Sequence, residues 1–237
     1  MGGPSRAGKS TDEGRGGVRV TEVELDRLSA HASIARFIRA LAAHPPREIQ
    51  ADGNVRRAAI LLALRARDDG EPELLLIKRA DAEGDPWSGH IACPGGRMEP
   101  TDHDLAVTAV RETWEETGVD VARDGRLLGQ LDDLSPRSAL LPPIVIRPFV
   151  AIVRSDVVIT PSAEVASAFW VPTSVLAERT SWSTGLVHTT AGQRRVSTFR
   201  HGEHMVWGLT ERVLRQFLTY LGEPPVGESV DHPDPLH

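Results

Sequence analysis

Residues 95–119 read GGRMEPTDHDLAVTAVRETWEETGV, and the rest of the chain is best understood outward from this stretch. It begins with two glycines suited to a tight turn and continues as an acidic loop. A segment with the length of about three helical turns follows. Either Asp102 or Asp104 is placed to cap the start of that helix, and Gly118 stands where a left-handed residue usually ends one. The stretch therefore predicts a turn, a loop and a helix in that order.

The predicted helix has one packing side and one acidic side. At roughly 100° per residue, Glu112, Glu115 and Glu116 gather opposite the apolar positions. Like charges at this spacing cost an isolated helix about 0.2–0.5 kcal/mol per pair, and the last turn of a helix favours cations. Arg111 alone cannot neutralise three carboxylates, so the pattern favours a hard divalent cation held by oxygen ligands and substrate phosphates. The predicted packing arc consists of Ala106, Val107, Val110, Thr113 and Trp114.

The letters RETWEETGV at residues 111–119, preceded by the glycines at 95–96, resemble the Nudix box, G-x5-E-x7-R-E-U-x-E-E-x-G-U with U aliphatic. Counted back from position 111, that template places its first glycine at position 97 and its first glutamate at position 103. This chain has Gly96 and Asp102 instead, so its loop is one residue longer, and Thr113 replaces the aliphatic residue. Asp102 or Glu99 is the candidate replacement for the missing glutamate.

Segments on both sides of the box resemble one branch of that family, the coenzyme A pyrophosphatases. LLIKRA at residues 75–80 and GHIACPGG at 89–96 are similar to the branch signature LLxxR[SA] followed by GxxxFPGG, with Cys93 where the branch usually has Phe. The branch also has the longer loop, in the form GGxxxPTDxD. LDDLSPRS at 131–138 and VWGLT at 206–210 look like further segments of it. The resemblance covers about residues 55–222.

The resemblance implies a set of metal ligands around the helix. Glu112 and Glu116 are expected to bind Mg²⁺ or Mn²⁺ first, and Glu115 directly or through water. The carbonyl of Gly96 is expected to add an oxygen. Arg111 is expected to orient the glutamates by charge-assisted hydrogen bonds rather than to touch metal.

Four further residues are candidates for roles in such a site. Family members often use a glutamate from a later loop as a ligand or general base, which makes Glu164 a candidate against the plain alternative of an exposed loop acid. Arg79, Lys78 and Arg137 are candidates to bind substrate phosphates, against the alternative of solvated surface cations.

The implied activity is hydrolysis of the pyrophosphate bond of a nucleoside diphosphate linked to another group. Coenzyme A is the first substrate hypothesis, giving 3′,5′-ADP and 4′-phosphopantetheine. A broad ADP-ribose, NADH or dinucleotide pyrophosphatase is the alternative. A non-catalytic nucleotide-binding Nudix domain is a third hypothesis, disfavoured because the arginine and the three glutamates of the box are intact.

Composition and charge bear on nucleic-acid binding, membrane insertion and cellular location. The chain has 237 residues, 40% apolar and 25% charged, with a net charge of −6. Nucleic-acid binding needs a basic footprint, so no nucleic-acid partner is expected. No apolar run approaches the ~20 residues of a membrane helix, and the N-terminus lacks a secretory apolar core. The single Cys93 suits a reducing compartment, so the expected location is the cytoplasm.

The chain is predicted to hold one domain, over residues 18–222, between a disordered tail at 1–17 and a loose tail at 223–237. Residues 21–43 have helical periodicity, as one helix or two split near 31–33, and are a candidate homodimer interface. A β-hairpin is expected over 58–66 and 73–78. Later strands are expected at 127–131, 145–153 and 169–171, a short helix at 172–177, a second hairpin at 185–188 and 195–199, and a closing helix at 209–221. Together these predict an α/β/α sandwich with a mixed central sheet.

Overall fold

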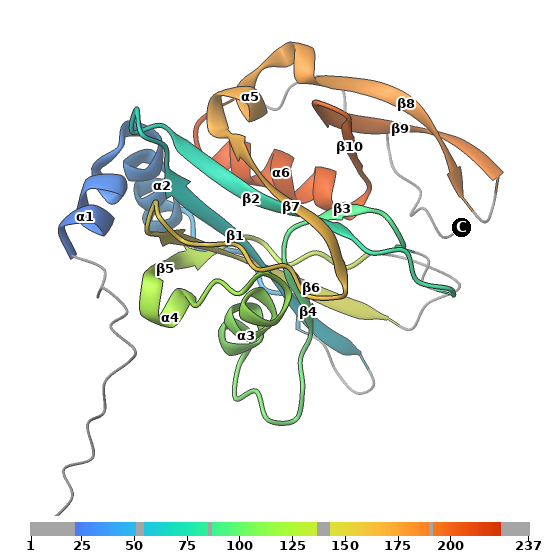
Figure 1. The fold of residues 1–237 in the computed structure, drawn as a ribbon, viewed down its shortest axis with the longest axis horizontal. Helices are drawn as coiled ribbons and strands as arrows, with labels where there is room; N and C mark the ends of the chain where they lie inside the picture. The colour runs from blue at the N-terminus through green and yellow to red at the C-terminus, as the bar shows by residue number, and fades with distance from the viewer. Residues whose placement is uncertain (1–21, 51–54, 85–86, 137–142, 190–191, 224–237) are drawn as a thin grey trace, which may run out of the picture.

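A seven-stranded mixed sheet forms the centre of the molecule (Figure 1). The structure is a computed structural model and describes residues 22–50, 55–84, 87–136, 143–189 and 192–223. The strands of this sheet are β1 (Arg56–Ala66), β2 (Pro72–Arg79), β3 (Ile91–Ala92), β4 (Gly95–Arg97), β5 (Gly125–Gln130), β6 (Ile144–Val153) and β7 (Val165–Pro172). Their hydrogen-bonded order is β3-β2-β1-β6-β5, with β4 also on β1 and β7 also on β2. β1 and β6 are parallel and the other pairs are antiparallel.

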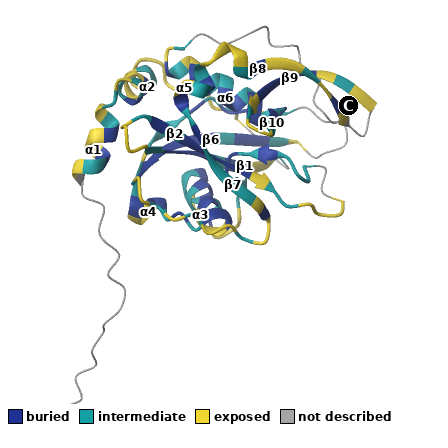
Figure 2. Cartoon of the chain, turned by 45° about the horizontal axis from the view of Figure 1, so that its top comes forward, coloured by how far each residue is buried: buried dark blue, intermediate teal, exposed yellow. Residues whose placement is uncertain are grey.

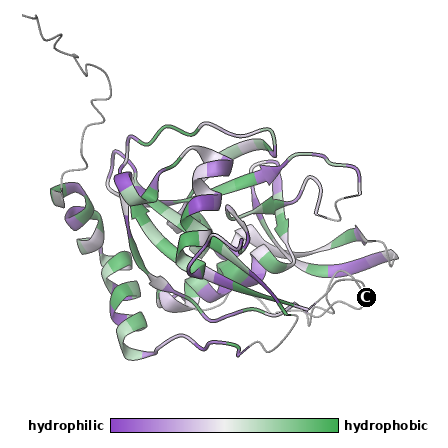
Figure 3. Cartoon of the chain, turned by 90° about the horizontal axis from the view of Figure 1, so that it is seen from below, coloured by the Kyte–Doolittle hydropathy of each residue, from purple (hydrophilic) through white to green (hydrophobic). Residues whose placement is uncertain are grey.

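The predicted hairpin of β1 and β2 is confirmed, with Leu64 opposite Leu74. Side chains alternate across a strand, and here both sides are buried. Leu62 and Leu64 enter one apolar core while Leu61 and Ala63 enter the other. The strands are therefore apolar almost throughout (Figure 3), as expected of a sheet covered on both faces.

Helices cover the two faces of the sheet, which confirms the predicted α/β/α sandwich (Figure 2). One face carries α3 (Leu105–Thr117) and α4 (Val121–Asp124). The other face carries α1 (Glu22–Ala30), α2 (Ala32–Ala43), α5 (Thr173–Ala177) and α6 (Leu209–Tyr220), with the short 3₁₀ turn η1 (Arg179–Ser181).

A second sheet of three strands lies in the layer of α6. Its strands are β8 (Trp182–Thr189), β9 (Gly192–His201) and β10 (His204–Trp207), in the order β10-β9-β8. The predicted second hairpin is confirmed and is longer than expected, whereas β10 was not predicted. Phe199 and Val206 share a core with Phe217 of α6, so this sheet fixes the start of α6 beside the central sheet.

The N-terminal helical segment is split into α1 and α2, one of the two predicted forms. The split falls at His31, whose Nδ1 accepts a hydrogen bond from the Ser33 backbone N–H at 3.4 Å. Phe37 of α2 is fully buried, with its ring 5.6 Å from that of Phe217. In the described ranges no helix is long and apolar enough to cross a membrane. The predicted tail at 1–17 and residues 224–237 lie outside the described residues, and the count of one domain stays a prediction.

Truncation of Phe37 tests whether α2 folds as part of the same domain. Phe37→Ala removes a buried aromatic ring and is expected to lower the free energy of unfolding by about 3–5 kcal/mol in urea denaturation. Val23→Ala, at a position 67% exposed on α1, is the control and is expected to change it by less than about 0.5 kcal/mol. An unchanged, single transition in Phe37→Ala would show that α2 is not docked on this core.

Candidate active site

Helix α3 begins and ends as the sequence predicts, but its packing side matches the prediction only in part. The Asp104 side chain caps it by accepting from the Val107 N–H at 2.8 Å, and Gly118 ends it at φ 72°. Thr113 is buried and Ala106 and Val110 pack against the core as predicted, whereas Trp114 is 57% exposed and Glu116 is buried. Small side chains let α3 lie closely on β1, and its buried side consists of Leu105, Thr108, Ala109, Thr113, Glu116 and Thr117.

Arg111 joins the acidic loop to the acidic side of α3. Its guanidinium donates to both Asp102 carboxylate oxygens at 3.0 and 2.9 Å and to the carbonyl of Arg97 at 3.0 Å. It also donates to Glu112 Oε1 at 3.1 Å and to Glu115 Oε2 at 2.9 Å. Arg111 thus contacts two of the three glutamates, and its role in orienting them stays a prediction.

Asp102 is the buried anchor of Arg111 and not the helix cap. Its side chain also accepts from the Glu99 N–H at 2.9 Å and from the Thr108 hydroxyl at 3.0 Å. These bonds, the one from Arg111 first, hold the pKa of the Asp102 carboxyl well below its usual range. Asp102 and Glu99 are the two candidates for the glutamate missing from the box. Of these, the Asp102 carboxylate contacts Arg111, whereas Glu99 contributes only a backbone N–H bonded to Asp102.

The two glycines of β4 hold the carboxylates of α3 at close range. Gly95, at φ 152°, donates its N–H to Glu116 Oε2 at 2.8 Å, and a Cβ there would lie 2.3 Å from the carbonyl oxygen of Ala59. A Cβ on Gly96 would lie 2.4 Å from the carboxylate carbon of Glu112. A side chain at Gly95 would clash with the backbone, and one at Gly96 would displace the Glu112 carboxylate, so the glycine pair lets the two glutamates lie against the strand.

Glu112 and Glu116 carry unfavourable negative charge in the absence of a cation. Burial raises the pKa of Glu116 to about 7, and repulsion from Glu112 and Glu164 adds to this. Burial likewise raises the pKa of Glu112, while Arg111 opposes the rise. The nearest cation to Glu116 is Arg79, with Nη1 3.9 Å from Oε1. The site therefore favours added positive charge.

Backbone hydrogen bonds place the loop of Glu164 beside this cluster. The N–H groups of Thr160 and Ser162 donate to the carbonyls of Thr117 and Glu116 at the end of α3, at 2.8 and 3.0 Å. On the other side, the Ala80 N–H donates to the Glu164 carbonyl at 2.8 Å. The loop thus bridges α3 and β2.

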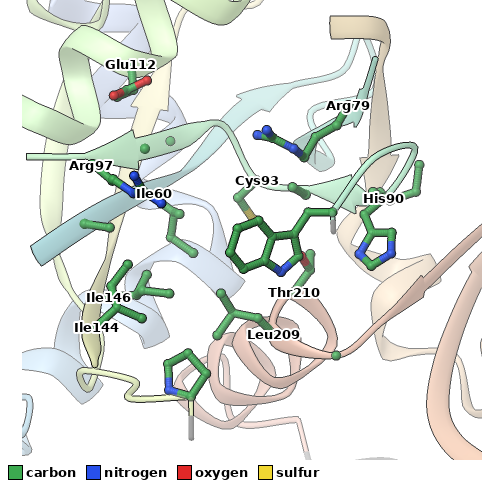
Figure 4. Close-up of a pocket in the computed structure, with 18 of the residues that line it drawn as sticks. Ile60, Arg79, His90, Cys93, Arg97, Glu112, Ile144, Ile146, Leu209 and Thr210 are labelled. Carbon is green, nitrogen blue, oxygen red and sulfur yellow. The ribbon is translucent and has the colours of Figure 1, made fainter. Parts of the chain in front are cut away.

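A cavity of about 500 Å³ lies beside the glycine pair (Figure 4). The acidic end consists of Glu112, Glu116 and Glu164. The remaining wall is mainly apolar and aromatic, and includes Ile60, Trp87, His90, Cys93, Ile144, Ile146, Trp207 and Leu209. Burial raises the pKa of the Cys93 thiol to about 12, consistent with a small wall residue.

The structure brings most of the predicted site residues together. Arg79 lines the cavity with the three acids, after a shift of strand register between Lys78 and Arg79. Lys78 is exposed and does not line the cavity, and Glu115 lies outside its lining in contact with Arg111. Arg137 lies outside the described residues. The roles assigned to all these residues stay predictions.

Sequence reasoning missed two arginines that line the cavity, Arg97 and Arg212. Arg97 follows directly after the glycine pair. Because side chains alternate along a strand, its position next to Gly96 could have placed it on the opposite side of β4. For Arg212, the only signal was its position two residues after the VWGLT segment.

The side chains at the acidic end fit a hard divalent cation. Within the described part of the chain, no three His, Cys, Asp or Glu side chains converge into a preformed metal cage. Mg²⁺ is usually held by one or two carboxylates together with waters and substrate phosphates rather than by such a cage. Two desolvated carboxylates on one cavity wall, with a third on the adjoining loop, match that requirement.

The fold is an α/β/α sandwich, and in its site the carboxylates of Glu112 and Glu116 on α3 lie against Gly95 and Gly96 of β4. The NUDIX domain family model matches residues 55–189. Two relatives named "Uncharacterized Nudix hydrolase NudL" are each 31% identical. The one from Photorhabdus laumondii aligns over 173 residues, 73% of this chain and 88% of the relative. The one from Yersinia pestis aligns over 161 residues, 68% and 77%.

The chain therefore belongs to the Nudix family and is a Nudix hydrolase. Members of this family act on nucleoside diphosphate derivatives and generally use divalent metal cations. A solved MutT/nudix family protein from Enterococcus faecalis superposes with a TM-score of 0.43 at 17% identity, over 79% of this chain and 63% of that one. The assignment rests on the family model and the curated relatives.

Asp102→Asn tests the anchoring of Arg111. The asparagine keeps the shape but removes the charge of a buried ion pair, so the free energy of unfolding at pH 7 is expected to fall by about 3 kcal/mol. Asp104→Asn is the control, because Asn caps a helix as well as Asp does, and it is expected to change stability by less than about 0.5 kcal/mol.

Acid should erase the difference between wild type and Asp102→Asn. A carboxyl whose folded-state pKa is lowered stabilises the fold above its unfolded pKa of about 3.9. That contribution is lost as pH falls toward the folded-state pKa. Urea denaturation between pH 7 and pH 2 is expected to show the two curves converging below about pH 4. A constant gap across this range would contradict the pairing.

Proposed function

We propose that this Nudix hydrolase uses Mg²⁺ or Mn²⁺ to cleave the pyrophosphate bond of a nucleoside diphosphate linked to another group. Coenzyme A is the first candidate substrate, and its hydrolysis would give 3′,5′-ADP and 4′-phosphopantetheine. The observation that carries the proposal is the placement of Glu112, Glu116 and Glu164 at one end of a cavity large enough for the rest of a nucleotide.

In this proposal Glu112 and Glu116 hold the cation with the help of substrate oxygens, and the carbonyl of Gly96 and Glu115 are further candidates. A bound divalent cation withdraws charge from phosphate oxygens and eases deprotonation of water. Arg111 fixes the direction of the Glu112 carboxylate through the bond at 3.1 Å.

Two residues at the cavity rim contact the reacting group in this proposal. Arg79, close to Glu116 and on the cavity lining, pairs with phosphate oxygens. Glu164 takes a proton from the attacking water or adds a ligand oxygen, because it lines the same end of the cavity from a loop attached to α3.

A broader pyrophosphatase is the second candidate, favoured by Cys93. This residue lines the cavity where the coenzyme A branch usually carries the larger Phe, so the wall leaves more room at this point. ADP-ribose, NADH or a dinucleotide then becomes a candidate substrate. Cytoplasmic location and a homodimer through residues 21–43 also remain predictions.

A substrate panel with Mg²⁺ or Mn²⁺ tests the choice between these candidates. Coenzyme A is expected to have a kcat/KM about tenfold or more above those of ADP-ribose, NADH and diadenosine polyphosphates, since one or two specific contacts supply that discrimination. Phosphate-containing products are quantified by chromatography. Faster turnover of ADP-ribose or NADH would replace coenzyme A while the diphosphate chemistry stands.

Glu116→Gln tests the cation site with a measurement that does not depend on turnover. The variant can keep the acceptor for the Gly95 N–H and loses the buried charge. In a chelator its melting temperature is expected to equal or exceed that of wild type, because an unneutralised buried carboxylate is removed. Mn²⁺ is expected to raise the melting temperature of wild type only.

The same variant should lose activity on diphosphates by about a hundredfold or more, as expected when a metal ligand is removed. Exposed Glu178→Gln, beside α5 and outside the cavity lining, is the matched control and should behave as wild type. Near-normal rates in Glu116→Gln would remove this residue from the cation site.

A further inference from the structure

The cavity continues well past its acidic end. Ile60, Ile144, Ile146 and Leu209 form an apolar stretch of its wall (Figure 4). If the diphosphate lies against Glu112, as in the proposed function on which this inference rests, the remainder of the substrate lies along this stretch. The residues at that part of the wall then determine which substrates are preferred.

Of the described residues, three arginines line the cavity: Arg79, Arg97 and Arg212. Arg79 lies 3.9 Å from Glu116. In the described ranges, the guanidinium groups of Arg97 and Arg212 make no ion pair with another described residue. By contrast, Arg147, which is largely buried, is paired with Asp133 at 2.8 Å. Among the described residues, the cavity therefore has two guanidinium groups that no carboxylate neutralises.

Arg97 faces away from the acidic cluster. Gly96 faces α3, because a Cβ there would meet the Glu112 carboxylate, and Met98 packs into the core on the α3 side. Side chains alternate along a strand, so Arg97, between them, faces the α6 side of the sheet. Figure 4 shows it on the Ile60 side of the cavity, away from Arg79. Arg212 lines the cavity from α6 itself.

We infer that Arg97 and Arg212 bind a second anionic group of the substrate, separate from the diphosphate held at the glutamates. Guanidinium groups bind phosphate through paired charge-assisted hydrogen bonds, and an apolar wall strengthens such bonds. On a nucleoside diphosphate, a phosphomonoester on the ribose is one such additional anionic group, and it is the one proposed here. The two arginines thus select nucleotides that carry an extra ribose phosphate.

Equilibrium binding without any metal tests this inference. Calorimetry in a chelator compares AMP with adenosine 3′,5′-bisphosphate, which differ by one ribose phosphate. Wild type is expected to bind the bisphosphate about tenfold or more tightly. Arg97→Gln and Arg212→Gln should each reduce that ratio, and the double variant should bring it close to one. Arg39→Gln, exposed on α2 and outside the cavity lining, is the matched control and keeps the wild-type ratio.

Two results would overturn the inference: a wild type that does not prefer the bisphosphate, including one that binds neither nucleotide, or an unchanged ratio in both single variants. Circular dichroism and melting temperature confirm that each variant is folded. Hydrolysis of coenzyme A and of 3′-dephospho-coenzyme A by wild type is measured in parallel. Hydrolysis of both without any preference for the extra phosphate refutes the second subsite and leaves the proposed function intact. Preferential binding of the bisphosphate without hydrolysis of any diphosphate supports the second subsite and refutes the proposed function.

Discussion

The hydrogen bonds of the Arg111 guanidinium are the interaction on which the site depends. They reach back to Asp102 and the carbonyl of Arg97 in the loop, and along the helix to Glu112 and Glu115. Three carboxylates near the end of one helix repel one another and oppose the helix dipole. By holding Glu112 and Glu115 while Asp102 balances its own charge, Arg111 lets α3 fold with its acids already oriented.

The central sheet separates the carboxylates of α3 from the apolar part of the cavity wall. On the edge of β1 away from β6, residues 58–60 pair with β4 and residues 64–66 pair with β2. Cys93 lies in the chain between β3, which pairs with β2, and β4, which pairs with β1, and it lines the cavity. The carboxylates of α3 approach from one face, and the apolar wall and α6 approach from the other. The site therefore draws on elements packed in both apolar cores, one on each face of the central sheet.

Local features of this fold could be predicted from the sequence because local chemistry determines them. The Asp104 cap, Gly118, the β1–β2 hairpin and the split helix near His31 all depend on residues within a few positions. The packing side of α3 was predicted only in part, because the large apolar Trp114 suggested a side that is exposed, while small residues beside Thr113 allow close packing. That Arg97 and Arg212 line the same cavity depends on packing between segments more than a hundred residues apart, for which a single sequence carries no periodic signal.

The proposed chemistry depends on a divalent cation bound by the carboxylates of Glu112 and Glu116 in the cavity beside Gly96. The most direct measurement is anomalous scattering at the manganese edge from crystals soaked in Mn²⁺ with a non-hydrolysable diphosphate analogue. We expect a strong peak in contact with both carboxylates and with the analogue. Full occupancy of the analogue with no peak at that position, at saturating Mn²⁺, would contradict it.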